Sequence, residues 1–241
     1  MQKYILTSKS GIITARRLAN LLNMNCYLQP KIISPAIRWG NTNGDYLQDT
    51  ELNDKNLIIK ASSKVSFSEL MEISGVPNVT LYKNILPESY PVFIRTLTRS
   101  SCGKGIKIVT NEEEFNQYRY NYYSYFYDFK FEIRVHVLDG KVVKVFKKVF
   151  MPEDGSESEE TYPIRNSKNN YTFKRKNIEA FPKAINLVDK IYEVLPLRFM
   201  GVDMGFIKNY GYKVIEVNTA PSLNGETLLL YKDFFERNLQ I

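Results

Sequence analysis

The sequence predicts an α/β protein in which β-hairpins alternate with helices. Two turn signals, Asp139-Gly140 and Asn209-Tyr210-Gly211, each lie between apolar runs, and such turns join the strands of hairpins. Apolar residues recur at helical spacing over 13–23 and 181–194, which predicts helices there. With 241 residues, the chain can bury a sizeable core as one large domain or as two or three lobes.

The composition narrows the class of protein. An apolar content of 44% and a charged content of 24% are typical of a soluble globular protein. We find no apolar run near the roughly 20 residues that span a bilayer, and no apolar signal segment near residue 1, so we expect a cytoplasmic protein without a membrane partner. The net charge of +7 favours anionic partners such as nucleotides, polyphosphates, acidic peptides or nucleic acid.

Cysteine and histidine usage argues against several chemistries. Cys26 and Cys102 are far apart and lack metal-ligand spacing, so we expect neither a disulfide framework nor a zinc site. His136 is the single histidine, which argues against catalysis by a Cys-His or Ser-His pair.

A predicted hairpin within 201–223 carries three oxygen-bearing side chains on one face. A two-residue turn at 209–210 places Asp203 opposite Glu216, and a turn at 210–211 places it opposite Asn218. Two carboxylates and an amide oxygen suit Mg²⁺. The alternative is a strand pair with its polar face in water, although Glu216 and Asn218 lie within an apolar run that is typical of a buried strand.

The hairpin around Asp139-Gly140 places charged residues on one face of its strands. A two-residue turn there predicts Glu132 opposite Lys147, Arg134 opposite Val145 and His136 opposite Val143. The predicted polar face contains Glu132, Arg134, His136 and Lys147, and the other face contains Ile133, Val135, Val137 and Phe146. Such a face either lines a site or forms weak, exposed ion pairs.

A loop rich in small residues, 98–105, follows the predicted strand 91–95. Its backbone amides can approach phosphates closely, and Arg99 and Lys104 add positive charge. The spacing is not that of a P-loop. The alternative is a plain turn between strand 91–95 and a following strand, 105–109.

Two further segments have alternative interpretations. Ser66 followed by Glu69 fits a capping box at the start of a helix that Gly75 ends. Trp39, the single tryptophan, lies in the segment Arg38–Gly40 and either anchors this loop to the core or faces a substrate with it.

Aromatic and acidic segments lie between the two hairpins. A helix capped by Asn111 is predicted to continue into an aromatic cluster, 118–129, which packs as core or hinge or else stacks nucleic-acid bases. The acidic segment 153–160 is predicted to be a mobile loop, and Arg165 and Asn166 lie where such a lid would fold back.

The order of these motifs resembles the ATP-grasp superfamily. ASSK ending at Lys64, PVFIR with Arg95, SSCGKG, FEIRVHV, GVD, VIEVN and NTAPSL follow one another as in its carboxylate–amine ligases. The likeness is to ribosomal-protein glutamate ligases and D-alanine–D-alanine ligases, and most of all to small phage-encoded members, which would place the protein in a host cytoplasm. It extends from about Leu52 to Tyr231 and is weaker before that.

This resemblance implies three lobes, 1–55, 56–124 and 125–241, with ATP clamped between the last two. Asp203, Glu216 and Asn218 would hold two Mg²⁺ ions, and Arg134 and Lys147 would contact the γ-phosphate and an acyl-phosphate. The residues implied in ATP binding are Lys64, Arg95, Ser101, Gly103, Lys104, Gly105, Tyr125, Phe126 and Asp128. Arg95 stands where the family usually has lysine, which keeps the charge but offers a planar fork of donors.

The implied reaction joins a carboxylate to an amine through an acyl-phosphate, with release of ADP and phosphate. The substrates would be an amino acid, a peptide or a protein tail. There are two alternatives to the ligase. One is an ATP-grasp kinase that phosphorylates a hydroxyl, and the other is a non-catalytic nucleic-acid-binding module, which the basic charge and the tyrosine-rich stretch suggest.

Overall fold

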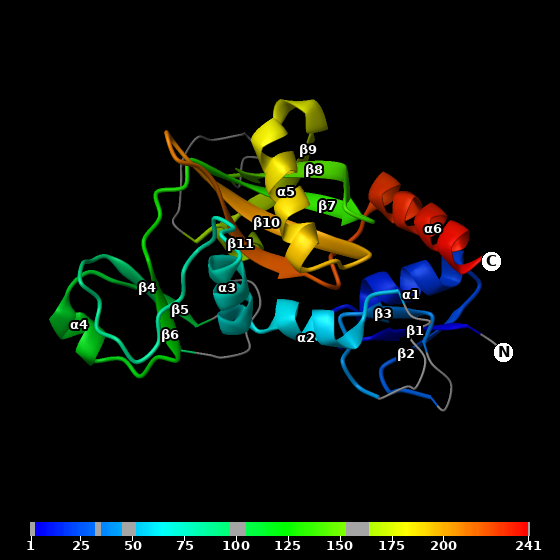
Figure 1. Ribbon diagram of the computed structural model, residues 1–241, viewed down its shortest axis with the longest axis horizontal. Helices are drawn as coiled ribbons and strands as arrows, with labels where there is room; N and C mark the ends of the chain where they lie inside the picture. Colours follow the sequence, from blue (N-terminus) through cyan, green and yellow to red (C-terminus); the bar gives the residue numbers. More distant parts are fainter. Residues whose placement is uncertain (1–2, 32–34, 45–51, 97–104, 153–163, 241) are drawn as a thin grey trace.

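Three β-sheets form the scaffold of the computed structural model, which describes residues 3–31, 35–44, 52–96, 105–152 and 164–240 (Figure 1). We call them the N-terminal sheet, with strand order β2-β1-β3, the small sheet, β5-β4-β6, and the central sheet, β11-β10-β7-β8-β9. The small sheet and the N-terminal sheet lie toward opposite ends of the molecule in Figure 1. The expectation of an α/β fold is confirmed.

The N-terminal sheet is parallel and shares its core with the last helix. It contains β1 (Tyr4–Thr7), β2 (Asn25–Tyr27) and β3 (Ile37–Trp39), with α1 (Ile12–Leu21) after β1 and α6 (Gly225–Leu239) against the same core. Trp39 is fully buried, and its ring stacks on Phe199 with centroids 5.0 Å apart. Trp39 therefore anchors its loop to the core, and the alternative of a substrate-facing tryptophan is wrong.

The small sheet presents one apolar face and one mixed face. Its strands are β4 (Val92–Arg95), β5 (Ile106–Val109) and β6 (Tyr122–Tyr125), all antiparallel, and α4 (Glu112–Asn116) packs on it. The apolar face holds Val92, Ile94, Val109, Phe115 and Tyr123. The predicted helix from Asn111 is shorter than expected, since Tyr122–Tyr125 pairs with β4, and tyrosine is common in strands.

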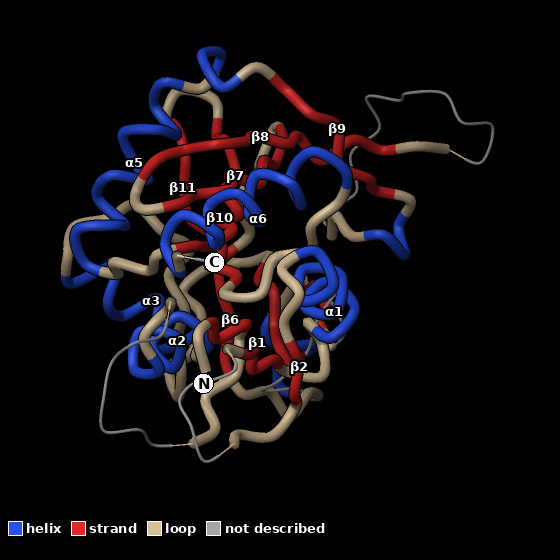
Figure 2. Tube along the Cα trace, turned by 90° about the vertical axis from the view of Figure 1, so that its right-hand side faces the viewer, coloured by secondary structure: helices blue, strands red, loops and turns tan. Residues whose placement is uncertain are grey.

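The central sheet separates an apolar core from a charged face. Its strands are β7 (Phe131–Leu138), β8 (Lys141–Phe150), β9 (Tyr171–Lys176), β10 (Phe199–Ile207) and β11 (Gly211–Asn218). The helix α5 (Pro182–Val194) packs on the apolar face, and α6 contacts the other face through Tyr231 and His136 (Figure 2). Two short 3₁₀ helices, Ser167–Asn169 and Ile178–Ala180, flank β9.

In the described part of the chain, two helices, not one, lie between the N-terminal sheet and the small sheet. They are α2 (Lys55–Ser62), capped by Asp54, and α3 (Lys64–Ile73), capped by Ser63, whose side chain accepts a hydrogen bond from the Ser66 amide. The capping box predicted at Ser66 is therefore wrong by one turn, while Gly75 ends α3 with a φ of +66°, as expected. Among the described residues, no helix has the length and apolar character needed to cross a membrane.

β-Bulges shift the register of both predicted hairpins. The turn at Asp139-Gly140 is confirmed, with φ of +45° and +75°, but Val143 is an extra residue in β8, so that Arg134 pairs with Phe146 and His136 with Lys144. The predicted pairs of Glu132 with Lys147, Arg134 with Val145 and His136 with Val143 are therefore wrong.

The β10–β11 hairpin differs from the prediction in its loop length and in a bulge, and the two differences cancel at Asp203. Ile207 pairs with Gly211, so its loop has three residues and not two. A bulge beyond Met204, which pairs with Val214, then brings Asp203 opposite Glu216. One of the two predicted pairings is thus confirmed, although by a different turn.

Candidate active site

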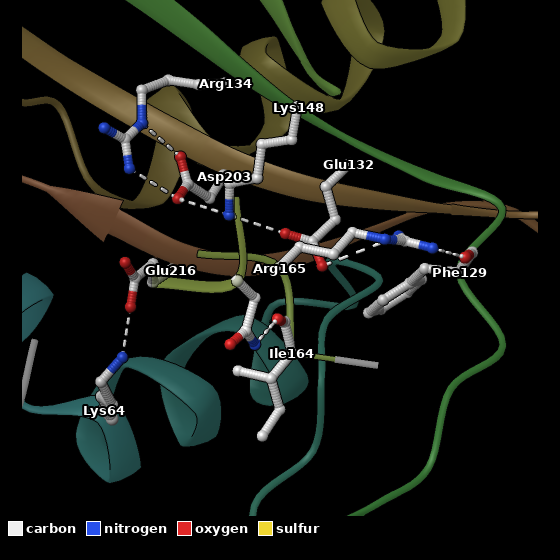
Figure 3. Close-up of polar contacts among 10 residues, drawn as sticks. Lys64, Phe129, Glu132, Arg134, Lys148, Ile164, Arg165, Asp203 and Glu216 are labelled. Atoms are coloured by element: carbon white, nitrogen blue, oxygen red, sulfur yellow. Dashed lines mark hydrogen bonds and ion pairs between the residues drawn. The ribbon is translucent and has the colours of Figure 1, made fainter. Parts of the chain in front are cut away.

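The charged face of the central sheet holds a bidentate ion pair at its centre. Arg134 on β7 and Asp203 on β10 lie directly opposite each other in the ladder. The guanidinium donates from Nε to Asp203 Oδ1 over 2.6 Å and from Nη2 to Oδ2 over 2.7 Å (Figure 3). Asp203 is only 2% exposed, so this pair is among the strongest polar contacts in the site.

Lys148, not Lys147, reaches this ion pair. Because Val143 is an extra residue, Lys148 falls on the same face as Arg134, where Nζ donates to Glu132 Oε2 over 2.7 Å and lies 3.8 Å from Asp203 Oδ2. Lys147 lies on the opposite face, with Nζ 5.0 Å from the ring centroid of Phe131. The expectation that Lys147 shares the face of Arg134 is therefore wrong, as is the placement of Phe146 on the apolar face.

A helix outside the central sheet supplies a third cation. Lys64, the first residue of α3, forms an ion pair with Glu216 on β11 (Figure 3). The two side chains are about a quarter to a third exposed, at 25% and 32%, so this side of the cluster is open to solvent.

Arg165 closes the cluster from the segment before β9. Its Nη2 donates to the carbonyl of Phe129, and its Nη1 lies 3.8 Å from Glu132 Oε1. The guanidinium is nearly buried, with 6% of the side chain exposed. The acidic segment 153–160, which we expect to form a lid, lies outside the described residues.

The carboxylates stay ionised because of the cations around them. Burial disfavours charge, but Arg134 and Lys148 outweigh it and hold the pKa of Asp203 below its usual value. Lys64 likewise lowers the pKa of Glu216 against the effect of burial. Burial also opposes the charge of Arg134, and Asp203 overcomes it to raise the pKa of that guanidinium.

The donor set on β10 and β11 fits a magnesium ion. Asp203 and Glu216 face each other, and Asn218, opposite Gly201, extends the same face. The Asn218 Nδ2 is buried and has no hydrogen-bond partner among the described residues. The described chain contains no group of three His, Cys, Asp or Glu side chains suited to a metal, so two carboxylates and an amide oxygen are the available ligands.

The small sheet carries two of the residues predicted to bind a nucleotide on or beside its mixed face. Arg95 pairs with Tyr122 across β4 and β6, on the face away from that sheet's apolar core. Phe93 on the same face stacks on Phe126, with ring centroids 5.4 Å apart. Phe126 is partly exposed, and so offers an aromatic surface next to the link from β6 to β7.

The other residues predicted to bind a nucleotide lie elsewhere. Tyr125 pairs with Val92 and packs against the apolar core of the small sheet, on the face opposite Arg95. The Tyr125 hydroxyl accepts from the Glu88 amide, and Asp128 forms an exposed ion pair with Lys130. Gly105 has a φ of +77°, and its carbonyl accepts from the Thr96 amide and hydroxyl. The remaining predicted residues, Ser101, Gly103 and Lys104, lie outside the described residues.

His136 does not line the open part of the site. It is 2% exposed, and its Nδ1 lies 3.2 Å from the Tyr231 hydroxyl. Burial and, to a smaller extent, the nearby Arg134 lower the pKa of His136 to about 4, so the ring is neutral at neutral pH.

Sequence reasoning missed three residues of the cluster as site residues. The sequence pattern places Glu132 on the correct face without a role, places Arg165 near the lid, and assigns Lys147 to the polar face in the position that Lys148 occupies. If the alternation of faces is counted from the C-terminal end of β8, Lys148 falls on the face of Arg134. The count from the Asp139-Gly140 turn gives Lys147 instead, because the bulge at Val143 lies between the two.

Solved structures share this fold over nearly the whole chain. The D-alanine–D-alanine ligase of Bacillus anthracis has a TM-score of 0.65 and 15% identity, covering 99% of this chain and 97% of that one. The ATP-grasp ligase PsnB, solved with a precursor variant, Mg and ADP, has a TM-score of 0.67 and 9% identity, covering 99% of both chains. The macrocyclase MdnC of Microcystis aeruginosa, bound to the precursor peptide MdnA, has a TM-score of 0.62 and 10% identity, covering 100% of this chain and 99% of that one.

The chain has the ATP-grasp fold. No family model matches it, and no curated protein matches its sequence, so the likeness is one of structure. The resemblance to ATP-grasp ligases inferred from the motifs is confirmed at this level.

The ATP-grasp scaffold explains why distant motifs meet. The small sheet holds Arg95, the helix α3 holds Lys64, and the central sheet holds Arg134 and Asp203. A cluster of this kind, cationic on several sides with ionised carboxylates between, can bind a polyphosphate together with a divalent cation.

Proposed function

We propose that this protein is an ATP-dependent ligase that joins a carboxylate to an amine through an acyl-phosphate. The observation that carries the proposal is the charged face of the central sheet, where Arg134, Lys148 and Lys64 each contact a carboxylate. This face lies in an ATP-grasp fold, which the ligases described above share.

ATP would bind between the small and central sheets. The link from β6 to β7, with Tyr125, Phe126 and Asp128, would contact adenosine, and Phe126 supplies the exposed aromatic surface for the base. Lys64, Arg95 and Lys148 would neutralise the phosphates together with the loop residues Ser101, Gly103, Lys104 and Gly105. The proposed lobes are 1–55, 56–124 and 125–241.

Asp203, Glu216 and Asn218 would hold Mg²⁺ at the charged face. When bound, Mg²⁺ neutralises phosphate charge and fixes the orientation of the triphosphate. Arg134 and Lys64, which hold these carboxylates in the described state, would then turn to phosphate oxygens, because both are donors that suit carboxylate and phosphate alike.

The reaction would proceed in two displacements. A substrate carboxylate oxygen attacks the γ-phosphorus, the bond to the β,γ-bridging oxygen breaks, and ADP leaves. The amine then attacks the acyl carbon, loses a proton and displaces phosphate. Arg134 would hold the acyl-phosphate, and Lys148 would take the role first assigned to Lys147, since Lys148 lies beside Arg134 and Asp203.

The substrates would be amino acids or peptides. The similar structures include a ligase of D-alanine and two enzymes solved with precursor peptides, and the basic charge of this chain suits an acidic carboxylate donor. An amino acid, a peptide or a protein tail would supply each reacting group.

The test is ADP release in a screen of amino acids and peptides with Mg²⁺ and ATP. In the presence of an accepted pair, Glu216→Gln should lower the rate at least about a hundredfold, because it removes a charged ligand of the metal. Glu216 is better suited than Asp203, whose loss would leave Arg134 buried without its partner. Glu226→Gln, an exposed acid paired with Lys144, is the matched control.

Retention of wild-type ADP release by Glu216→Gln would contradict the metal assignment. ADP formation that needs a hydroxyl compound and no amine would identify a kinase instead. Tight nucleic-acid binding that falls steeply with salt, and that Glu216→Gln leaves unchanged, would favour the binding module.

A further inference from the structure

The hydroxyl of Tyr122 is a buried polar group whose role is not yet explained. Tyr122 lies at the start of β6 and is 4% exposed. Its Oη is buried and has no hydrogen-bond partner among the residues that the structure describes. Buried hydroxyls in native proteins nearly always have a hydrogen-bond partner, so a buried hydroxyl without one points to a ligand or to a specific local reason.

The position of Tyr122 directs this hydroxyl toward the site. Tyr122 is paired with Arg95, and adjacent strand residues that are paired share a face. This face is the one opposite the apolar core of Val92 and Ile94. The ring of Tyr122 therefore does not belong to the aromatic core of the small sheet, although its neighbour Tyr123 does.

The charges that act on this hydroxyl come from two of the sheets. Burial raises the pKa of Tyr122, Arg95 opposes this, and the Glu216 carboxylate raises the pKa further. Arg95 belongs to the small sheet and Glu216 to the central sheet, so Tyr122 is close to charged groups of both. A raised pKa also keeps the hydroxyl protonated at neutral pH, as a hydrogen-bond donor.

Arg95 and Tyr122 together form a pair of donors that lack an acceptor. Arg95 has no ion-pair partner within the described part of the chain, whereas Lys64, Arg134, Lys148 and Arg165 all contact carboxylates. The nearby Glu216 is held by Lys64. A phosphate oxygen would satisfy both donors, because a guanidinium and a hydroxyl are common phosphate ligands.

We propose that Tyr122 is a nucleotide-binding residue whose hydroxyl donates a hydrogen bond to a phosphate oxygen that Arg95 neutralises. The proposal rests on the proposed ATP-dependent function and adds a phosphate contact from β6. A purely structural tyrosine would differ, since its hydroxyl would stabilise the free protein and leave nucleotide affinity unaffected.

The test is the variant Tyr122→Phe, which keeps the ring and removes the hydroxyl alone. Without nucleotide, the variant should unfold at the same temperature as the wild type or slightly above it, because the hydroxyl that it lacks makes no hydrogen bond in the free protein. The dissociation constant of ADP with Mg²⁺, measured by titration calorimetry, should rise about tenfold, as expected for one hydrogen bond to a charged group. Tyr118→Phe, on the opposite face beside Lys107, is the control and should leave it unchanged.

Three results would overturn the proposal. An unchanged ADP affinity in Tyr122→Phe would show that the hydroxyl does not contact the nucleotide. A clear fall in the unfolding temperature of the free variant with unchanged ADP affinity would assign it a structural role. A wild-type protein that binds neither ADP nor ATP with Mg²⁺ would contradict the proposed function itself, and the Tyr122 proposal with it.

Discussion

His136 is neutral because of where β7 places it. Its ring lies edge-on to Phe146 and to Tyr231, with centroids 5.6 and 5.8 Å away. The Tyr231 hydroxyl donates to the Met200 carbonyl over 3.3 Å, so its oxygen can accept a hydrogen bond from the Nδ1–H group of His136. A protonated imidazole would be buried near Arg134, and the Asp203 carboxylate offsets these two unfavourable effects only in part.

This burial predicts a pH dependence of stability. The pKa of His136 is lowered from 6.5 to about 4, so below pH 6.5 the unfolded chain takes up a proton that the folded chain does not bind until about pH 4. As far as His136 determines it, the free energy of unfolding should therefore be highest above pH 6.5. It should fall by about 3 kcal/mol in total between pH 6.5 and pH 4. Urea unfolding at several pH values would measure it.

The control for this pH dependence is His136→Gln. The variant should be less stable than the wild type at pH 7, because it alters packing against Tyr231, but its stability should fall less between pH 6.5 and 4. Parallel pH curves for the two proteins would show that His136 is not the group responsible.

At the scale of the strand, one extra residue decides which lysine enters the site. Lys147 and Lys148 are neighbours of the same type, and the bulge at Val143 places Lys148 beside Glu132 and Lys147 over the ring of Phe131. Replacement of either lysine by methionine keeps the length of the side chain and removes the charge.

The two lysines should therefore differ in their effect on turnover. Lys148→Met should reduce ATP turnover at least about a hundredfold, because it removes a cation from the phosphate site. Lys147→Met should change turnover less than about threefold. ADP release by both purified variants gives the comparison, with thermal unfolding to confirm that both are folded. Equal losses, or a larger loss for Lys147→Met, would contradict the observed register.

The same bulge marks the limit of what the sequence predicts. The turn at Asp139-Gly140 has a sequence signature, because both residues must adopt positive φ, and it was predicted correctly. The extra Val143 has no such signature, since a valine in a run of alternating residues looks the same whether or not it is paired. The pairing of Asp203 with Glu216 was predicted as one of two alternatives because the sequence does not fix the length of the 208–210 loop.

At the scale of the whole molecule, the site depends on contacts that no local pattern contains. Lys64 is far from Glu216 in the sequence, and Arg165 is far from Glu132. These residues come into contact only because α3 and the segment before β9 pack against the central sheet. The order of motifs predicted the ATP-grasp fold. It did not predict Tyr122, whose significance depends on a buried atom without a partner.

The balance of charge in this site predicts that nucleotide and magnesium bind together. Among the described residues, the carboxylates of Asp203 and Glu216 are already held by Arg134 and Lys64, so Mg²⁺ alone would have to displace these cations. A bound nucleotide offers phosphate oxygens to the same cations and frees the carboxylates. Each ligand should therefore strengthen the binding of the other by the same factor, since coupling between sites is reciprocal.

We expect the dissociation constant of ADP to rise about tenfold or more when EDTA removes the metal. Mg²⁺ without nucleotide should leave the unfolding temperature nearly unchanged, whereas Mg²⁺ with ADP should raise it. Calorimetric titrations of ADP into wild type and Glu216→Gln, each with Mg²⁺ and with EDTA, would measure the coupling. The variant should bind ADP with nearly the same affinity in both conditions, because it lacks a ligand that the metal needs. Strong binding of Mg²⁺ to the free wild-type protein would instead show that Arg134 and Lys64 do not compete with the metal for these carboxylates.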